Sequence, residues 1–155
     1  MDSVLTSLVV IFGTLAGSTL TFVFQRRIAR QSERFSQSRQ LWNERTAAYS
    51  ELAASLTEFR RSQNDRWHLE QEDPTSSEFI KAREESYQRR AEATAALCRV
   101  RLLCGSSELR ELAQEALDTA TEVHLARDEH DRAERGRAAR LALDTFLAQA
   151  ANQLL

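Results

Sequence analysis

Hydrophobic residues are concentrated at the start of the chain, and charge follows them directly. Residues 3–25 contain no charged side chain, and the next positions carry a basic cluster, Arg26, Arg27, Arg30 and Arg34. A helix of this length rises roughly 34 Å, enough to cross a hydrocarbon core of about 30 Å. We therefore predict a single-pass plasma-membrane anchor over 3–25. The arginines place the N-terminus outside and the bulk of the chain in the cytoplasm, and they are positioned to contact lipid headgroups or only to set topology.

A cleaved secretory signal and a buried soluble helix are the alternatives for this stretch. A secretory signal carries positive charge before its apolar core, whereas only Asp2 and the terminal amine precede this one. Gly13 and Gly17 form a GxxxG pair, and Thr21 continues the same helical face. Small residues let two spans approach closely, so this face predicts self-association, with a merely tolerated glycine pair as the alternative.

A seven-residue repeat of large apolar residues follows the anchor, at Ile28, Phe35, Trp42, Tyr49 and Leu56. A constant interval of seven favours pairing with another helix in a left-handed supercoil. The companion positions are polar as far as Arg45 and apolar from Leu52 onward. We therefore expect a basic juxtamembrane stalk over 26–40 and a packed cytoplasmic domain over 41–155.

Punctuating residues divide the packed domain into helices. Pro74 ends the first helix, and Asp73 or Thr75 is placed to cap a second one. Gly105 is placed to end that second helix in a left-handed conformation, after which Ser106 or Ser107 caps a third. The charged run at 127–137 predicts either a loop or a helix that bends or frays.

Each helix is expected to bury one apolar face. The expected faces are Leu41, Ala48, Leu52, Ala53 and Phe59 in the first helix, Ile80, Tyr87, Ala91, Thr94, Leu97 and Cys98 in the second, Leu109, Leu112, Ala116, Ala120 and Val123 in the third, and Leu143, Phe146, Leu147, Ala150 and Leu154 in the last. Short connections make successive helices antiparallel neighbours. The fold class predicted is all-α, a span and stalk leading into an antiparallel three- or four-helix bundle of coiled-coil type.

Composition supports a helical protein and gives little sign of catalysis. The chain has four glycines, one proline and a net charge of −2, so no direct nucleic-acid binding is expected. His68, His124 and His130 lack zinc-site spacing, and no nucleotide-binding or nucleophile motif occurs. We therefore expect no enzyme, no cofactor and no metal, and we expect Cys98 and Cys104 to be reduced thiols.

Two polar or aromatic features remain open after this search. Residues Glu111, Glu115, Asp118 and Glu122 share a helical face that can hold a cation or simply be solvated. Trp67 near the end of the first helix is either a contact for a protein partner or a side chain packed over the end of the bundle.

Residues 8–70 carry a family resemblance. The segment GTLAG in the apolar run, followed by QRRIARQSERFSQSRQLWNERTAAYSEL and RRSQNDRWHLE, is similar to small actinobacterial proteins labelled KilB, after a conjugative-plasmid protein. The resemblance implies a membrane-associated accessory in plasmid spread, lethal if unregulated, with no enzymatic residues to carry over.

Two functional hypotheses follow. In the first, the chain is a membrane-tethered interaction or scaffold protein, a possible homo-oligomer, that recruits an unidentified protein partner in plasmid transfer or envelope organisation. In the second, it is a membrane-active protein of the holin or toxin kind, whose oligomerised spans permeabilise the bilayer. The large patterned domain favours the first hypothesis, because a pore does not need it.

Overall fold

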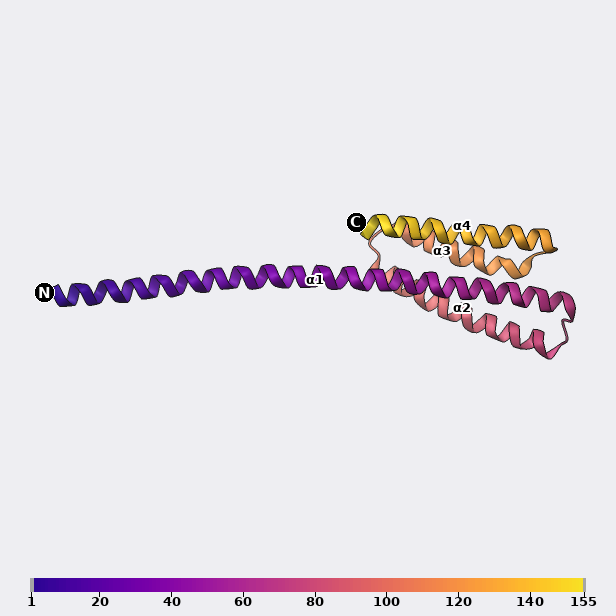
Figure 1. The fold of residues 1–155 in the computed structure, drawn as a ribbon, viewed down its shortest axis with the longest axis horizontal. Helices are drawn as coiled ribbons and strands as arrows, with labels where there is room; N and C mark the ends of the chain where they lie inside the picture. The colour runs from indigo at the N-terminus through magenta and orange to yellow at the C-terminus, as the bar shows by residue number, and fades with distance from the viewer. Residues whose placement is uncertain (1, 155) are drawn as a thin grey trace. The chain divides into compact units, whose positions relative to one another are not determined.

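The computed structural model describes the backbone of residues 2–154 and the side chains of residues 36–154. Within that range the chain forms four α-helices and no strand: α1 (Asp2–Glu72), α2 (Ser77–Leu103), α3 (Ser107–Glu122) and α4 (Glu129–Leu154), with a 3₁₀ turn, η1 (Val123–Leu125), between α3 and α4 (Figure 1). The all-α prediction is confirmed. The chain divides into two compact units, Met1–Leu41 and Trp42–Leu155.

The second unit is an antiparallel four-helix bundle. At one end, Trp42 Nε1 donates a hydrogen bond to the carbonyl of Leu154, 3.0 Å away. At the other end, Trp67 Nε1 donates to the carbonyl of Ala126 over 2.8 Å. The bundle segment of α1 therefore runs antiparallel to α4, and the orange α3 and yellow α4 lie side by side in Figure 1. Short connections at 73–76 and 104–106 force the reversals between the other neighbours.

One apolar core runs through this unit. Its largest fully buried side chains include Phe59 of α1 and Phe146 of α4, and the Tyr49 ring meets the Phe146 ring edge-on at 5.9 Å between centroids. Burying such a side chain contributes about 1.5–3 kcal/mol relative to leaving it in water. Alanines fill much of the space between the larger residues, at Ala48, Ala93, Ala96, Ala113, Ala116, Ala120, Ala139, Ala142 and Ala150. Small side chains at these positions let the helices approach closely.

The helix caps match the predictions only in part. Ser106 caps α3 as expected, accepting a hydrogen bond from the Leu109 amide over 3.3 Å. Ser76, and not Thr75, caps α2 by accepting from the Phe79 amide over 3.1 Å. The Thr75 amide instead donates to Asp73 Oδ1 over 2.8 Å, so Asp73 shapes the turn that precedes the cap.

The expected left-handed cap at Gly105 is wrong. None of the described residues has a positive φ angle. Helix α2 ends where Cys104 turns to an extended conformation, φ −87° and ψ 121°, while its amide still donates to the Val100 carbonyl. The chain therefore leaves the helix one residue earlier, through a conformation that needs no glycine.

Leu97 of the predicted α2 face is buried, but most of the buried face lies one residue from the predicted one. Phe79, Ser86, Ala93 and Val100, seven residues apart, point into the core, whereas Ile80 and Tyr87 are 48% and 56% exposed, and Ala91, Thr94 and Cys98 are exposed as well. Because Ser86 is polar, the pattern of apolar residues in the sequence does not identify this buried stripe. Its hydroxyl is buried because it donates to Gln63 Oε1 over 2.7 Å.

The charged run at 127–137 is mostly helix. The break lies at 126–128, directly after η1, and Asp128 Oδ1 accepts from the Asp131 amide over 2.8 Å to cap α4. Helix α4 then continues through Gly136 without interruption. Toward its C-terminus the predicted face is largely buried, although Leu147 is 37% exposed.

The predicted anchor at 3–25 lies outside the residues whose side chains are described. The same holds for Gly13, Gly17 and Thr21, for the basic cluster Arg26, Arg27, Arg30 and Arg34, and for Ile28 and Phe35 of the seven-residue repeat. Among the described residues, no helix is both long and apolar enough to cross a membrane.

Candidate functional site

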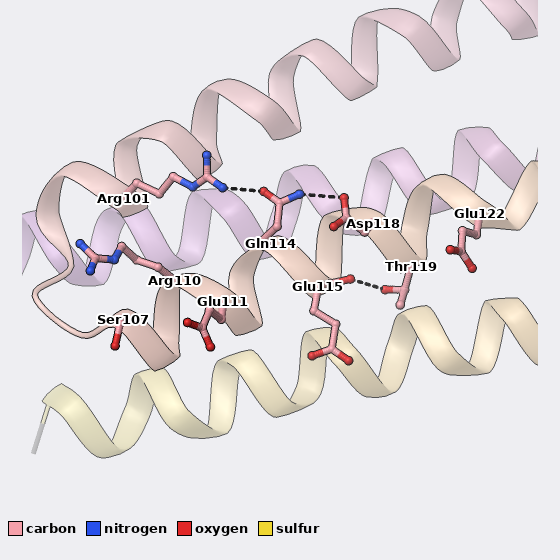
Figure 2. Close-up of a pocket in the computed structure, with 9 residues that line it drawn as sticks. All are labelled: Arg101, Ser107, Arg110, Glu111, Gln114, Glu115, Asp118, Thr119 and Glu122. Carbon is pink, nitrogen blue, oxygen red and sulfur yellow. Dashed lines mark hydrogen bonds between the residues drawn. The ribbon is translucent and has the colours of Figure 1, made fainter.

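A shallow groove lies along the surface of α3, where it faces the end of α2. Arg101 reaches across from α2 and donates to Gln114 Oε1 over 2.7 Å, and Gln114 Nε2 donates to Asp118 Oδ1 over 2.7 Å (Figure 2). Its lining consists of Arg101, Ser107, Arg110, Glu111, Gln114, Glu115, Asp118, Thr119 and Glu122. We call this surface the α2/α3 acidic groove.

The acidic groove gathers all four carboxylates that the sequence placed on one face. Two of them have partners on the protein: Asp118 accepts from Gln114, and Glu122 lies 3.5 Å from Arg135 of α4. In the part of the chain with described side chains, no group of His, Cys, Asp and Glu side chains is arranged to hold a metal ion. The groove therefore has the character of a solvated, partly neutralised face.

A second groove, of opposite charge, lies between α1 and α4. Five arginines line it together with a single carboxylate, and it encloses about 530 Å³. Its lining consists of Thr57, Glu58, Arg60, Arg61 and Asn64 from α1, Val123 from η1, and Arg132, Ala133, Gly136, Arg137 and Arg140 from α4. We call this surface the α1/α4 arginine groove.

The arginines of this groove differ in how well they are partnered. Arg132 is held by Asn64 and Glu129, and its guanidinium lies 5.5 Å from the centroid of the Trp67 ring. Arg137 approaches Glu134 at 4.0 Å. Arg60, Arg61 and Arg140 form no ion pair with any residue whose side chain is described. Much of the positive charge in the groove is therefore uncompensated.

The environment of Arg60 is unfavourable for its positive charge. Its Nε atom is buried and has no hydrogen-bond partner. Burial, and then the positive charge of Arg140, lower the pKa of Arg60, and Asp144 offsets this only in part. The positive charge of Arg140, on the facing helix, thus disfavours the charged form of Arg60.

A small polar cluster crosses the core between α1, α2 and α3. Gln63, 2% exposed, accepts from Ser86 through Oε1 and donates through Nε2 to the carbonyl of Thr121 over 3.2 Å. His124 Nδ1 lies 2.7 Å from the same carbonyl. Gln63 Nε2 lies 3.1 Å from the same ring nitrogen, so whether Nδ1 donates to the carbonyl or accepts from Gln63 depends on the tautomer. Burial, followed by the charge of Arg66, lowers the pKa of His124, which favours the neutral form of the ring.

Three members of the predicted pairing stripe lie within the bundle unit. Trp42 is 49% exposed, while Tyr49 and Leu56 are buried against helices of this same chain. Burial, together with a hydrogen bond to the Cys104 thiol, raises the pKa of Tyr49 to about 12. The structure thus supplies an intramolecular partner for this part of the stripe.

Trp67 is 6% exposed. Its indole bonds to Ala126, and its ring meets His68 edge-on at 5.1 Å. It therefore packs over the end of the bundle, where α1 meets the connection to α4. Cys98 is exposed, Cys104 is buried, and both are free thiols.

Sequence reasoning did not anticipate the α1/α4 arginine groove. Its two halves are separated by about seventy positions; in the sequence, Arg132 and Arg137 belong to the charged run at 127–137, and Arg140 lies beyond that run. A signal does exist: Arg60 and Arg61 lie on the bundle segment of α1, while Arg132, Arg137 and Arg140 share a side of α4. Recognising it requires the pairing of α1 with α4.

The described part of the chain thus defines a class: a small all-helical protein whose bundle carries two charged grooves. A family model assigns it further. The chain belongs to the KilB plasmid transfer protein family, and the matched region, residues 46–154, is nearly the whole bundle. The resemblance seen in the sequence rested on residues 8–70, so the two overlap only at 46–70. No curated protein matches the chain, and neither does any solved structure.

Proposed function

We propose that the chain is a membrane-tethered accessory of plasmid transfer, whose bundle acts as an interaction or scaffold domain for a protein partner. The observation that carries this proposal is the extent of the family match, which covers 46–154 and so coincides with the bundle. What the family shares therefore lies in the packed helices. The tether is inferred from the charge-free stretch at 3–25 and the arginines after it.

The surface of the bundle supports an interaction role. On α2, Ile80, Tyr87 and Leu102 are 48%, 56% and 86% exposed, although all three are large and apolar. Tyrosine is enriched at the centres of protein interfaces, where burial of such side chains supplies most of the binding free energy. A partner that covers this side of α2 would remove them from water.

The tether is tested by cell fractionation and a mating assay run on the same strains. The native chain should sediment with membranes, and Leu15→Arg should release it and lower the frequency of plasmid transfer. Leu15→Ile is the matched control and should behave like the native chain. Finding the native chain in the soluble fraction would refute the tether.

The partner is tested by cross-linking and mass spectrometry on intact membranes. The native chain should yield a reproducible cross-linked protein, and Tyr87→Glu with Leu102→Glu should abolish that cross-link while the bundle stays helical. Glu111→Gln with Glu115→Gln, in the α2/α3 acidic groove, is the control. An unchanged cross-link in the α2 variant would remove this face as the interface.

A further inference from the structure

The α1/α4 arginine groove has a charge arrangement that the bundle itself does not need. Five arginines and one carboxylate, Glu58, line about 530 Å³. Glu129 and Glu134, outside the lining, pair with Arg132 and Arg137, which leaves Arg60, Arg61 and Arg140 without an ion pair among the residues whose side chains are described. A surface arginine normally gains little from an ion pair, but it also costs little when it can reach water alone. Here arginines from two helices line one groove, so their mutual repulsion destabilises the protein when no anion is bound.

A comparison of Arg60 with Arg66 shows that this unfavourable environment is a feature of the groove. Arg60 and Arg66 both have a buried Nε atom without a hydrogen-bond partner. Arg66, however, lies over the Tyr87 ring at 5.7 Å from its centroid, a favourable cation–π contact. Arg60 has no such contact among the described residues, and the like charge of Arg140 lowers its pKa more than Asp144 raises it. A bound anion would supply Arg60 and Arg140 with a partner of opposite charge.

The size of the groove selects the anion. Three of its arginines, Arg60, Arg61 and Arg140, have no ion pair among the described residues, so a single carboxylate leaves two of them without a partner. An acidic peptide brings a backbone and side chain with each charge, whereas a short phosphate chain carries several charges in a compact volume. Arginine also binds phosphate oxygens in a bidentate manner.

Gly136 leaves room for such a ligand. It lines the groove in the middle of α4, and a Cβ added there would meet no atom within 4 Å. A residue with a side chain would extend from this position between Arg132 and Arg140, one turn away on either side. The open position and the converging arginines together define a binding site.

We propose that the α1/α4 arginine groove binds a soluble oligophosphate, with Arg60, Arg61 and Arg140 as its principal ligands. The binding partner is thus a compact polyanion of the polyphosphate or nucleoside-triphosphate kind. This inference does not depend on the tether or on the protein partner proposed above. It is tested on purified protein, without plasmid transfer as a readout.

The test uses tripolyphosphate and the full-length chain in neutral detergent, followed by isothermal titration calorimetry. At about 0.01 M ionic strength the Debye length is about 30 Å, and binding should be strongest there and weaken at higher salt. Arg140→Gln should weaken binding about tenfold, a loss typical of one charge-assisted contact. Arg110→Gln, which removes an exposed arginine of the acidic groove, should leave the affinity unchanged.

Substitution at Gly136 gives the sharper comparison. Gly136→Glu places a carboxylate inside the groove, while Gly136→Gln has the same shape without the charge. The glutamate variant should bind tripolyphosphate at least about tenfold more weakly than the glutamine variant. Without ligand, the glutamate variant should unfold at a higher temperature than the glutamine variant, because its carboxylate takes the place of the anion. Any fold defect from losing glycine affects both variants alike.

Four results would overturn the proposal. The first is no measurable binding at low salt, and the second is equal affinity for the two Gly136 variants. The third is displacement of tripolyphosphate by a hexaglutamate peptide at equal concentration, which would assign the groove to carboxylates. The fourth is groove-dependent binding only to vesicles containing phosphatidic acid, or tighter binding to single-stranded DNA, which would assign it to a lipid surface or to nucleic acid.

Discussion

The hydrogen bond between Ser86 and Gln63 makes a quantitative prediction about the core. Both side chains are almost fully buried, at 1% and 2% exposure, and the bond length is 2.7 Å. In Ser86→Ala, Gln63 Oε1 loses its donor in a site that water does not reach. The amide cannot flip to recover, because its oxygen would then face the carbonyl of Thr121.

The expected cost follows from these contacts. A buried hydrogen bond contributes about 1 kcal/mol, and stranding its partner costs about 1–3 kcal/mol. Alanine regains about 0.5 kcal/mol through its higher helix propensity. Ser86→Ala should therefore lower the free energy of unfolding by about 1–2.5 kcal/mol. The measurement is urea unfolding followed by circular dichroism, with the m-value unchanged.

A second variant separates the polar contact from simple packing. In Ser86→Ala with Gln63→Met, the stranded oxygen is gone and an unbranched apolar chain takes its place. This double variant should be less destabilised than the two single variants added together, with a coupling of about 1 kcal/mol or more. If Ser86→Ala is as stable as the native chain, or the two changes are additive, the account of the buried pair is refuted.

Three further changes test other parts of the bundle. Trp67→Phe removes the donor to Ala126 and should lower the free energy of unfolding by about 1–3 kcal/mol in urea titrations; equal stability would contradict its packing role. His124 has a lowered pKa, so the unfolded chain binds its proton more tightly and stability should fall as pH drops below about 6.5, whereas His124→Asn should flatten this part of the profile. Ser106→Ala should cost about 1 kcal/mol of helix capping, visible as a lower melting temperature, while Ser107→Ala should not.

How far the sequence predicts this fold depends on how cleanly each helix separates polar from apolar residues. In α3, Leu109, Ala116, Ala120 and Val123 of the expected stripe are buried and Leu112 is partly buried, because charged residues occupy the other side. In α2 the pattern misleads, since apolar Ile80 and Tyr87 lie outside while polar Ser86 lies inside. The burial of Ser86 depends on its hydrogen-bond partner Gln63 on α1. The local sequence pattern of α2 does not contain that partner.

The conformation at the end of α2 and the α1/α4 arginine groove are even harder to predict from the sequence. A glycine after a helix predicts a left-handed cap, yet Cys104 already turns the chain in an extended conformation. The groove arginines lie on helices whose pairing is fixed only by contacts such as Tyr49 with Phe146. Their charges look solvated in the linear sequence. Only the fold reveals that they converge.

The pairing of α1 with α4 also constrains how the bundle assembles. The two tryptophan bonds that join α1 to the α4 side of the bundle span 112 and 59 positions of chain, whereas α1 and α2 are joined by a four-residue turn. Contacts between distant segments form late, because closing a long loop costs more entropy than closing a short one. We therefore expect the α1–α2 hairpin to form first during synthesis, with the Tyr49 ring not yet covered by Phe146. A chain interrupted before α4 would expose this aromatic surface, a substrate for chaperones and proteases.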